Sequence, residues 1–276
     1  NNLTSTIGTV EYDLNDGFSQ TIYDTKYFNL IINGSGSKIV DHLILDVHGD
    51  LTVTAGTLDL ANSSGINKNN EIDLEGDFSM AAGGAFDAGT STTHTVGGSW
   101  TDIVGSTFTP NNGNFTFQSV AGNTTITTNS SFYDLSVETT GDTVSAAAVL
   151  TVDNDFTMTA TNTGNFSAAA ALNVNGAFTM DALNTGNFIT GSNTVTVTGA
   201  TNIDGGILEI AAGTFDANGD FDADGQTVTF TGDGTLKLGG DAGKGLTPNL
   251  GTLNDDAGLP NISKGTVIYD NQGGPQ

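Results

Sequence analysis

The stretch "LTVDNDFTMTATNTGNF", from Leu150 to Phe166, returns as "LNVNGAFTMDALNTGNF", from Leu172 to Phe188. The two copies are offset by 172 − 150 = 22 residues, and their apolar residues stay in register. An earlier part of the chain repeats the same step, because Phe78 and Trp100 are also 22 residues apart. A short fixed period of this kind is the sequence signature of a stacked repeat protein.

Within each repeat, apolar and polar residues alternate, as in "LTVTAGTLDL" from Leu51 and "TVTFTGDGTLKL" from Thr227. Strict alternation predicts strands with one buried face, and the Gly, Asn and Asp between them predict turns. We therefore predict an all-β fold, a parallel β-helix (β-solenoid) with turns of about 22 residues. Tandem β-sandwich modules are the alternative fold, and they would break the 22-residue ladder.

A longer repeat lies over the short one, since residues 8–60 resemble residues 113–165 with an offset of 113 − 8 = 105. The opening "GTVEYD" from Gly8 also returns near the other end as "GTVIYD" from Gly265. We predict one elongated solenoid module over 1–264, and interpret 265–276 as the first strand of a following module or as an assembly strand. Self-association through such strands would involve Gly8, Val10, Tyr12, Gly265, Val267 and Tyr269.

The composition restricts the partners of the chain. Its 276 residues include 6 Lys, no Arg and 31 acidic residues, which give a net charge of −25. This charge repels phosphate backbones and anionic lipids, so we expect neither nucleic-acid binding nor membrane insertion. No stretch is apolar enough for a membrane helix and no signal peptide opens the chain, so the chain is either a mature or excerpted segment or a cytosolic protein. Its composition favours the first, and we expect an exported protein. The absence of cysteine excludes disulfides and thiolate chemistry.

The strand "GTVEYD", followed by "QTIYDTKYFNLIINGSGSK" and "HGDLTVTAGTLDL", resembles the repeats of large secreted bacterial surface proteins. These are adhesins of the filamentous-haemagglutinin-like and autotransporter-passenger-like kind. The resemblance implies a right-handed parallel β-helix, export to the cell surface, and a role in adhesion, surface layers or fibres. It concerns the style of the repeats and names no ligand.

One acidic stretch is a candidate calcium site. In "DANGDFDADG", Asp220, Asp222, Asp224 and Gly225 have the spacing that begins a calcium-binding loop. Thr231 stands where such a loop needs its bidentate Glu, and a plain strand with these three Asp residues outward gives the same pattern. Calcium is the one cofactor that this stretch suggests.

Other chemistry-bearing residues are interpreted as structural. Trp100 occupies a position held by Leu51 and Phe78 in other copies, so we predict that it lies in the core rather than on a sugar-binding surface. The three histidines, His42, His48 and His94, have no repeated spacing to carboxylates and are predicted to lie at the surface. No metal centre or catalytic triad is expected from them.

These observations predict a non-enzymatic structural or adhesive protein of an extracellular surface fibre. It would be either a subunit that joins head to tail or one module of a tandem array, with a glycan or other cell-surface ligand as a candidate partner. A carbohydrate-binding or carbohydrate-cleaving β-helix is one alternative, although the chain lacks the Arg that commonly binds acidic sugars. An ice-binding solenoid is another, suggested by stretches such as Thr194 to Thr198, but the Thr pair at Thr157 and Thr159 is not repeated one turn later.

Overall fold

The computed structural model of the chain describes residues 8–23, 25–61, 70–119, 122–239, 248–255 and 265–269. All regular secondary structure in these residues is β-strand, and the strands are parallel and stacked as a β-solenoid with about 21 residues per turn. The predicted fold class is confirmed. The chain divides into two compact units, residues 1–135 (unit 1) and 136–276 (unit 2), each of which has this architecture.

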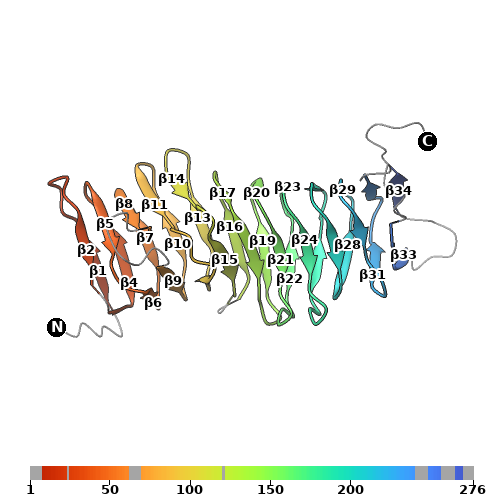
Figure 1. Cartoon of the computed structure of the whole chain (residues 1–276), viewed down its shortest axis with the longest axis horizontal. Coiled ribbons are helices and arrows are strands. Elements are labelled where there is room, and N and C mark those ends of the chain that lie inside the picture. The colour runs from red at the N-terminus through yellow and green to blue at the C-terminus, as the bar shows by residue number, and fades with distance from the viewer. Residues whose placement is uncertain are drawn as a thin grey trace. The chain divides into compact units, whose positions relative to one another are not determined.

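Unit 1 winds through three parallel sheets, one strand in each sheet per turn (Figure 1). Its first sheet holds β1 (Thr9–Tyr12), β4 (Asn29–Ile32), β7 (Leu51–Val53), β10 (Phe78–Met80), β13 (Trp100–Asp102) and β16 (Thr124–Thr127). Its second sheet holds β2 (Gln20–Ile22), β5 (Ser37–Val40), β8 (Gly56–Asp59), β11 (Gly84–Asp87) and β14 (Thr107–Thr109). Its third sheet holds β3 (Lys26–Tyr27), β6 (Ile44–Val47), β9 (Glu71–Leu74), β12 (His94–Val96) and β15 (Asn114–Phe117). The strands β17 (Ser131–Phe132) and β18 (Asp134–Val137) follow.

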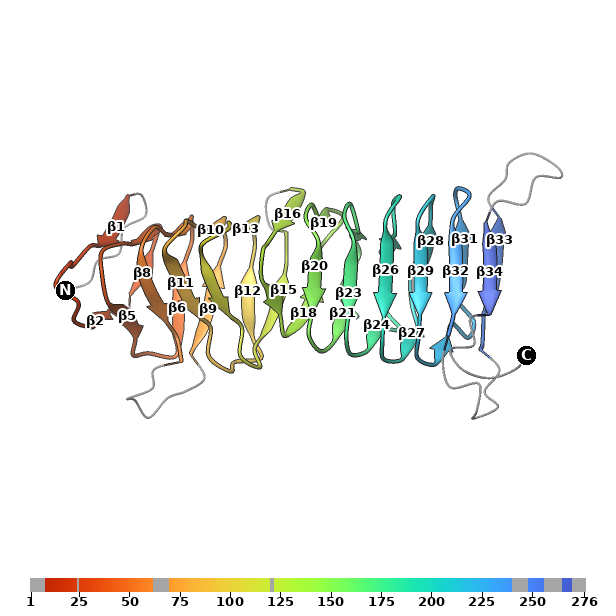
Figure 2. The same ribbon diagram turned by 90° about the horizontal axis from the view of Figure 1, so that it is seen from above.

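Unit 2 repeats the three-sheet arrangement, and Figure 2 shows β26, β29 and β32 side by side. Its first sheet holds β19 (Thr143–Ala146), β22 (Asn165–Ser167), β25 (Asn187–Ile189), β28 (Ile207–Ile210), β31 (Thr227–Phe230) and β33 (Thr252–Asp255). Its second sheet holds β20 (Leu150–Val152), β23 (Leu172–Val174), β26 (Thr194–Val197), β29 (Thr214–Ala217), β32 (Thr235–Leu238) and β34 (Thr266–Tyr269). Its third sheet holds β21 (Phe156–Met158), β24 (Phe178–Met180), β27 (Thr201–Ile203) and β30 (Phe221–Asp222).

The 22-residue ladder read from the sequence is the strand register of the structure. Phe156 lies opposite Phe178, and their rings stack at 5.2 Å with an interplanar angle of 6°. Phe78 lies opposite Trp100 with ring centroids 3.9 Å apart, and both side chains are buried. Each fully buried aromatic ring contributes on the order of 2–3 kcal/mol of hydrophobic stabilisation. The prediction that Trp100 belongs to the core is confirmed.

One corner of unit 2 needs glycine and asparagine at fixed positions. The Asn162 Nδ2 donates to the Oδ1 of Asn184 on the next turn at 2.8 Å, and both side chains are buried. A Cβ on Gly186 would collide with the backbone carbonyl of Gly164 on the preceding turn. The repeated "NTG" of the sequence is therefore a corner where successive turns approach closely.

The 105-residue repeat is not a whole number of turns. It relates β1 to β15, which is 15 − 1 = 14 strands later, or four turns of three strands plus two strands. As a result, β1 lies in the first sheet of unit 1, whereas β15 lies in the third. Within unit 1, the similar sequences of β1 and β15 therefore occupy different sheets. The predicted module at 265–276 falls partly outside the described residues, which here include 265–269 only.

Candidate functional site

The two strands with matching sequences, β1 and β34, pair on opposite edges. β1 pairs with the strand of the following turn, β4, with Val10 opposite Leu30. β34 pairs with the strand two before it in the chain, β32, with Val267 opposite Leu236. Within the described part of the chain, no strand pairs with the preceding-turn edge of β1 or the following-turn edge of β34. A strand edge without a neighbour is a site for addition of another strand.

The backbone shows which groups face the open edge of β34. The Thr266 N–H donates to the Gly234 carbonyl at 2.9 Å, on the β32 side. Adjacent residues of a parallel strand bond to opposite neighbours, so the N–H and C=O of Val267 point to the open edge. The equivalent position in β1 is Val10, which lies two residues from both Gly8 and Tyr12 and therefore faces the same side as they do. The carbonyls of Gly8 and Tyr12 accept the N–H groups of Asn29 and Asn33, on the β4 side. The open edge of β34 thus corresponds to the edge of β1 that β4 occupies.

The tyrosine that occurs in both copies of the end strand has different surroundings in each. Tyr12 is buried, and its hydroxyl lies 2.9 Å from the Tyr27 hydroxyl. Tyr27 donates to the Tyr23 carbonyl at 3.0 Å, so Tyr12 donates to Tyr27 and accepts the Tyr23 N–H. Tyr269 is 57% exposed. The predicted self-association residues therefore include one tyrosine already enclosed within unit 1 and one that stays largely in solvent.

Several exposed apolar side chains lie in the first and last described turns. Phe18 precedes β2 and Tyr23 follows it, and they are 72% and 70% exposed, respectively. In unit 2, Leu253 of β33 and Ile268 of β34 are each 42% exposed. Large apolar side chains in solvent favour association when they lie together with open strand edges.

The candidate calcium residues alternate as a strand would place them. Phe221 and Ala223 are buried, while Asp220, Asp222 and Asp224 are exposed. The Asp222 Oδ1 accepts the backbone N–H of Asp224 at 3.0 Å. In the residues that the structure describes, no three His, Cys, Asp or Glu side chains form a group that could hold a metal ion. Calcium binding by these three residues stays a prediction from the sequence.

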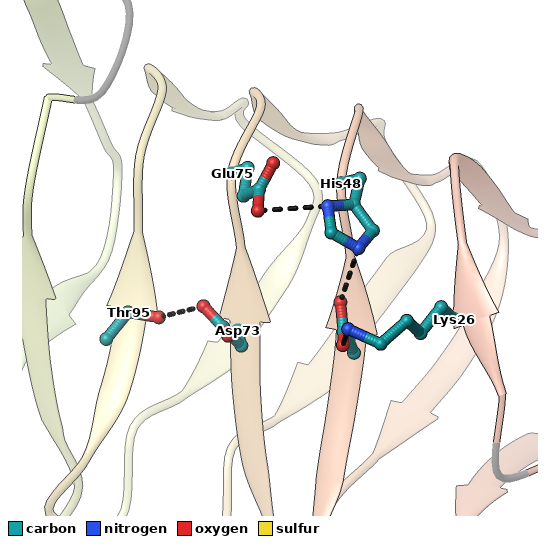
Figure 3. A network of polar contacts seen from close by, with 6 residues as sticks. Lys26, His48, Asp73, Glu75 and Thr95 are labelled. Atoms are coloured by element: carbon teal, nitrogen blue, oxygen red, sulfur yellow. Dashed lines mark hydrogen bonds and ion pairs between the residues drawn. The ribbon is translucent and has the colours of Figure 1, made fainter. Parts of the chain in front are cut away.

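A polar network covers the outer side of the third sheet in unit 1 (Figure 3). The Lys26 Nζ lies 2.7 Å from Asp46 Oδ2, and this contact raises the pKa of Lys26. The His48 ring joins two turns, with Nε2 3.4 Å from Asp46 Oδ1 and Nδ1 2.9 Å from Glu75 Oε1 (Figure 3).

Asp73, two residues before Glu75, accepts the hydroxyl hydrogen of Thr95 at 2.6 Å. The charged groups of this network are therefore engaged in links between successive turns. His48 is exposed, as predicted, but its carboxylate contacts were not foreseen because they depend on which turns stack.

The outer face of the second sheet in unit 2 bears on the ice-binding alternative. Thr194, Thr214, Thr235 and Thr266 lie in register on four strands. The next outward column contains Asp216 and Lys237, which form an ion pair at 3.0 Å. A flat face of paired threonines is thus not repeated from turn to turn.

Asp102 is a buried carboxylate that the sequence pattern did not predict. Asp102 is fully buried, and its Oδ2 accepts the indole N–H of Trp100 at 2.9 Å and the hydroxyl of Thr128 at 2.5 Å. Its Oδ1 accepts the backbone N–H of Asn129 at 2.8 Å. Three donors offset the cost of burying the carboxylate. The only sequence signal for this arrangement was the pattern Trp-x-Asp, in which both side chains face inward.

The prediction that the histidines lie at the surface is wrong for His94. Its side chain is fully buried and stacks on Phe115, with ring centroids 4.5 Å apart. The Nδ1 accepts the backbone N–H of Ile72 at 3.3 Å, so the hydrogen of the neutral ring is on Nε2. Burial lowers the pKa of His94 to about 4. The physical reason for the error is that His94 occupies an inward position of β12 that Ile72 holds in β9.

Lys38 is also buried, at an inward position of β5. Its ammonium donates to the backbone carbonyls of Ser35 and Leu14 at 2.9 and 3.3 Å. Burial lowers the pKa of Lys38, while Asp16 and Asp13 oppose this shift. The side chain thus spans from the core to a corner, where two carbonyls solvate its charge.

The sequence matches no protein-family model, and neither the curated proteins nor the solved structures give a match. Among the described residues there is no helix of the length and apolarity needed to cross a membrane.

Proposed function

We propose that this chain is a structural protein of an extracellular surface fibre, in which solenoid turns continue from one module to the next. Continuation is either covalent, in a tandem array, or non-covalent, between copies. The observation that carries the proposal is the complementarity of the end strands. β34 offers a following-turn edge and β1 offers a preceding-turn edge, the two kinds of edge that every internal pair of parallel strands joins.

The side chains at these ends support the same proposal. Ile268, Tyr269 and Leu253 are partly exposed in unit 2, and Phe18 and Tyr23 are exposed in unit 1. Contact between two different edges is heterologous, and a heterologous contact that does not close produces a filament. Export and adhesion remain part of the proposal through the resemblance of the repeats to bacterial surface proteins.

The test uses a proline on the open edge. Val267→Pro removes an N–H that faces this edge and leaves the Thr266 N–H bond to Gly234 in place. Ile268→Val is the matched control, because it keeps the backbone donor and a β-branched apolar side chain. We expect negative-stain electron microscopy and sedimentation velocity to show linear oligomers for the native chain and the control.

Val267→Pro, or a chain that stops at Ser263, should sediment as single particles. Single particles of the native chain at all concentrations would contradict non-covalent assembly and leave the covalent array as the proposed arrangement.

A further inference from the structure

We propose that β34 of one copy takes the place of β1 in a second copy and pairs there with β4. This inference rests on the non-covalent form of the proposed function, and it places the contact between copies at β4 instead of at the preceding-turn edge of β1. The occupant of the open edge is therefore a second molecule of the same chain, with its own first strand displaced.

β34 matches β1 at the positions that β1 presents to β4. Gly8 and Gly265 both have positive φ, at 130° and 95°. Val10 and Val267 are the inward valines, and Tyr12 and Tyr269 hold the next inward position. Simple stacking of one end on another would not require the last strand to repeat the first strand. Replacement of one by the other does require it.

The backbone groups of β34 also fit the edge of β4. The groups of β1 that bond to β4 belong to Gly8 and Tyr12, with Val10 between them at the same parity. The corresponding position in β34, Val267, directs its N–H and C=O to the open edge. β34 can therefore present to β4 the same alternation of donors and acceptors as β1 does, without giving up its bonds to β32.

The sequences of β1 and β34 differ at a single position, and this difference favours the exchange. Glu11 of β1 lies opposite Ile31 of β4, and Ile268 of β34 would take this place. Glu11 is exposed and bonds to Asn33 Nδ2 at 2.8 Å. An Ile–Ile pair across neighbouring strands is more favourable than a Glu–Ile pair. At this position, β4 therefore pairs more favourably with β34 than with β1.

β1 can separate from β4. Among the described residues, β1 pairs with one strand, β4, whereas β4, β7, β10 and β13 each pair with two strands, so fewer backbone bonds must break to release β1. Tyr269, whose side chain is largely exposed, would then occupy the buried position of Tyr12. There its hydroxyl would contact the Tyr27 hydroxyl and the Tyr23 N–H.

Cysteine crosslinking tests the register, because the native chain contains no cysteine. Neighbouring strands lie about 4.8 Å apart, within the Cα–Cα range of a disulfide. One population carries Ile268→Cys, and it is mixed with a second population carrying Ile31→Cys, Glu11→Cys or Thr21→Cys. We expect an intermolecular disulfide with Ile31→Cys and little with the other two. Preferential crosslinking to Glu11→Cys or Thr21→Cys would mean that β34 stacks on an intact end, and would overturn the exchange.

A second experiment blocks the displacement itself. The double variant Glu11→Cys/Ile31→Cys can form a disulfide within one chain, and this bond holds β1 on β4. We expect the oxidised variant to lose oligomers at least tenfold relative to its reduced form, as measured by sedimentation velocity. Equal assembly of both forms would overturn the exchange while leaving the proposed function intact. If the native chain does not assemble at all, both the exchange and non-covalent assembly fail.

Discussion

Trp100 donates its indole hydrogen to the Oδ2 of Asp102, 2.9 Å away, and both side chains are fully buried in unit 1. Asp102 also accepts bonds from Thr128 and Asn129. Asp102→Ala should lower the free energy of unfolding by about 3 kcal/mol, because it leaves buried donors without an acceptor. Urea unfolding followed by Trp100 fluorescence would measure this. Asp233→Asn, at an exposed position, is the control and should change little.

His94 should make unit 1 less stable in acid. Its folded-state pKa of about 4 lies below the value of about 6.5 expected in the unfolded chain, so the unfolded state binds more protons between these values. The stability is thus fully present above about pH 6.5 and is lost as the pH falls toward 4, by up to roughly 3 kcal/mol.

The His94→Leu variant provides the comparison, since its residue 94 cannot take up a proton. Urea unfolding of both proteins from pH 7 to pH 4.5 should give a steeper loss for the native chain. Equal pH slopes would contradict a role for His94 in this dependence.

The sequence predicted the solenoid because its evidence is local and repeated: inward apolar residues alternate, and copies 22 residues apart pair directly, as Leu150 does with Leu172. It did not predict the buried polar groups. His94 and Lys38 occupy inward positions in strands whose neighbours place Ile72 and Leu58 there, and nothing in the pattern shows a single polar replacement to be buried. The sequence match of β1 and β34 was visible, but the opposite directions of their open edges required the strand register.

Tyr27→Phe should lower the free energy needed to separate β1 from the rest of unit 1. The change removes the hydroxyl that contacts the Tyr12 hydroxyl and the Tyr23 carbonyl, at a cost of about 1–2 kcal/mol. Because the loss is local to the first turn, hydrogen exchange should increase in residues 9–12 and 29–32 more than in β7 or β10. It should also speed assembly if release of β1 limits the rate. Uniformly faster exchange across the unit would instead indicate global destabilisation.

Two glycine substitutions in unit 2 separate steric from conformational cost. Gly186→Ala places a Cβ against the Gly164 carbonyl of the preceding turn and should destabilise the unit by roughly 3 kcal/mol. Gly225 has open space around its Cβ position and a φ of +71°, so Gly225→Ala should cost only about 1 kcal/mol. Thermal unfolding followed by circular dichroism would compare the two. Similar losses for both variants would contradict the close approach at Gly186.

The fourteen-strand offset between β1 and β15 has a consequence for how this sequence can diversify. A duplication of four turns and two further strands places each copied strand in a different sheet from the original. A duplication of whole turns would place the copy in the same sheet. Within unit 1, the similar sequences of β1 and β15 thus lie in two different sheets. A solenoid built in this way presents the same kind of surface on more than one side without evolving that surface anew on each.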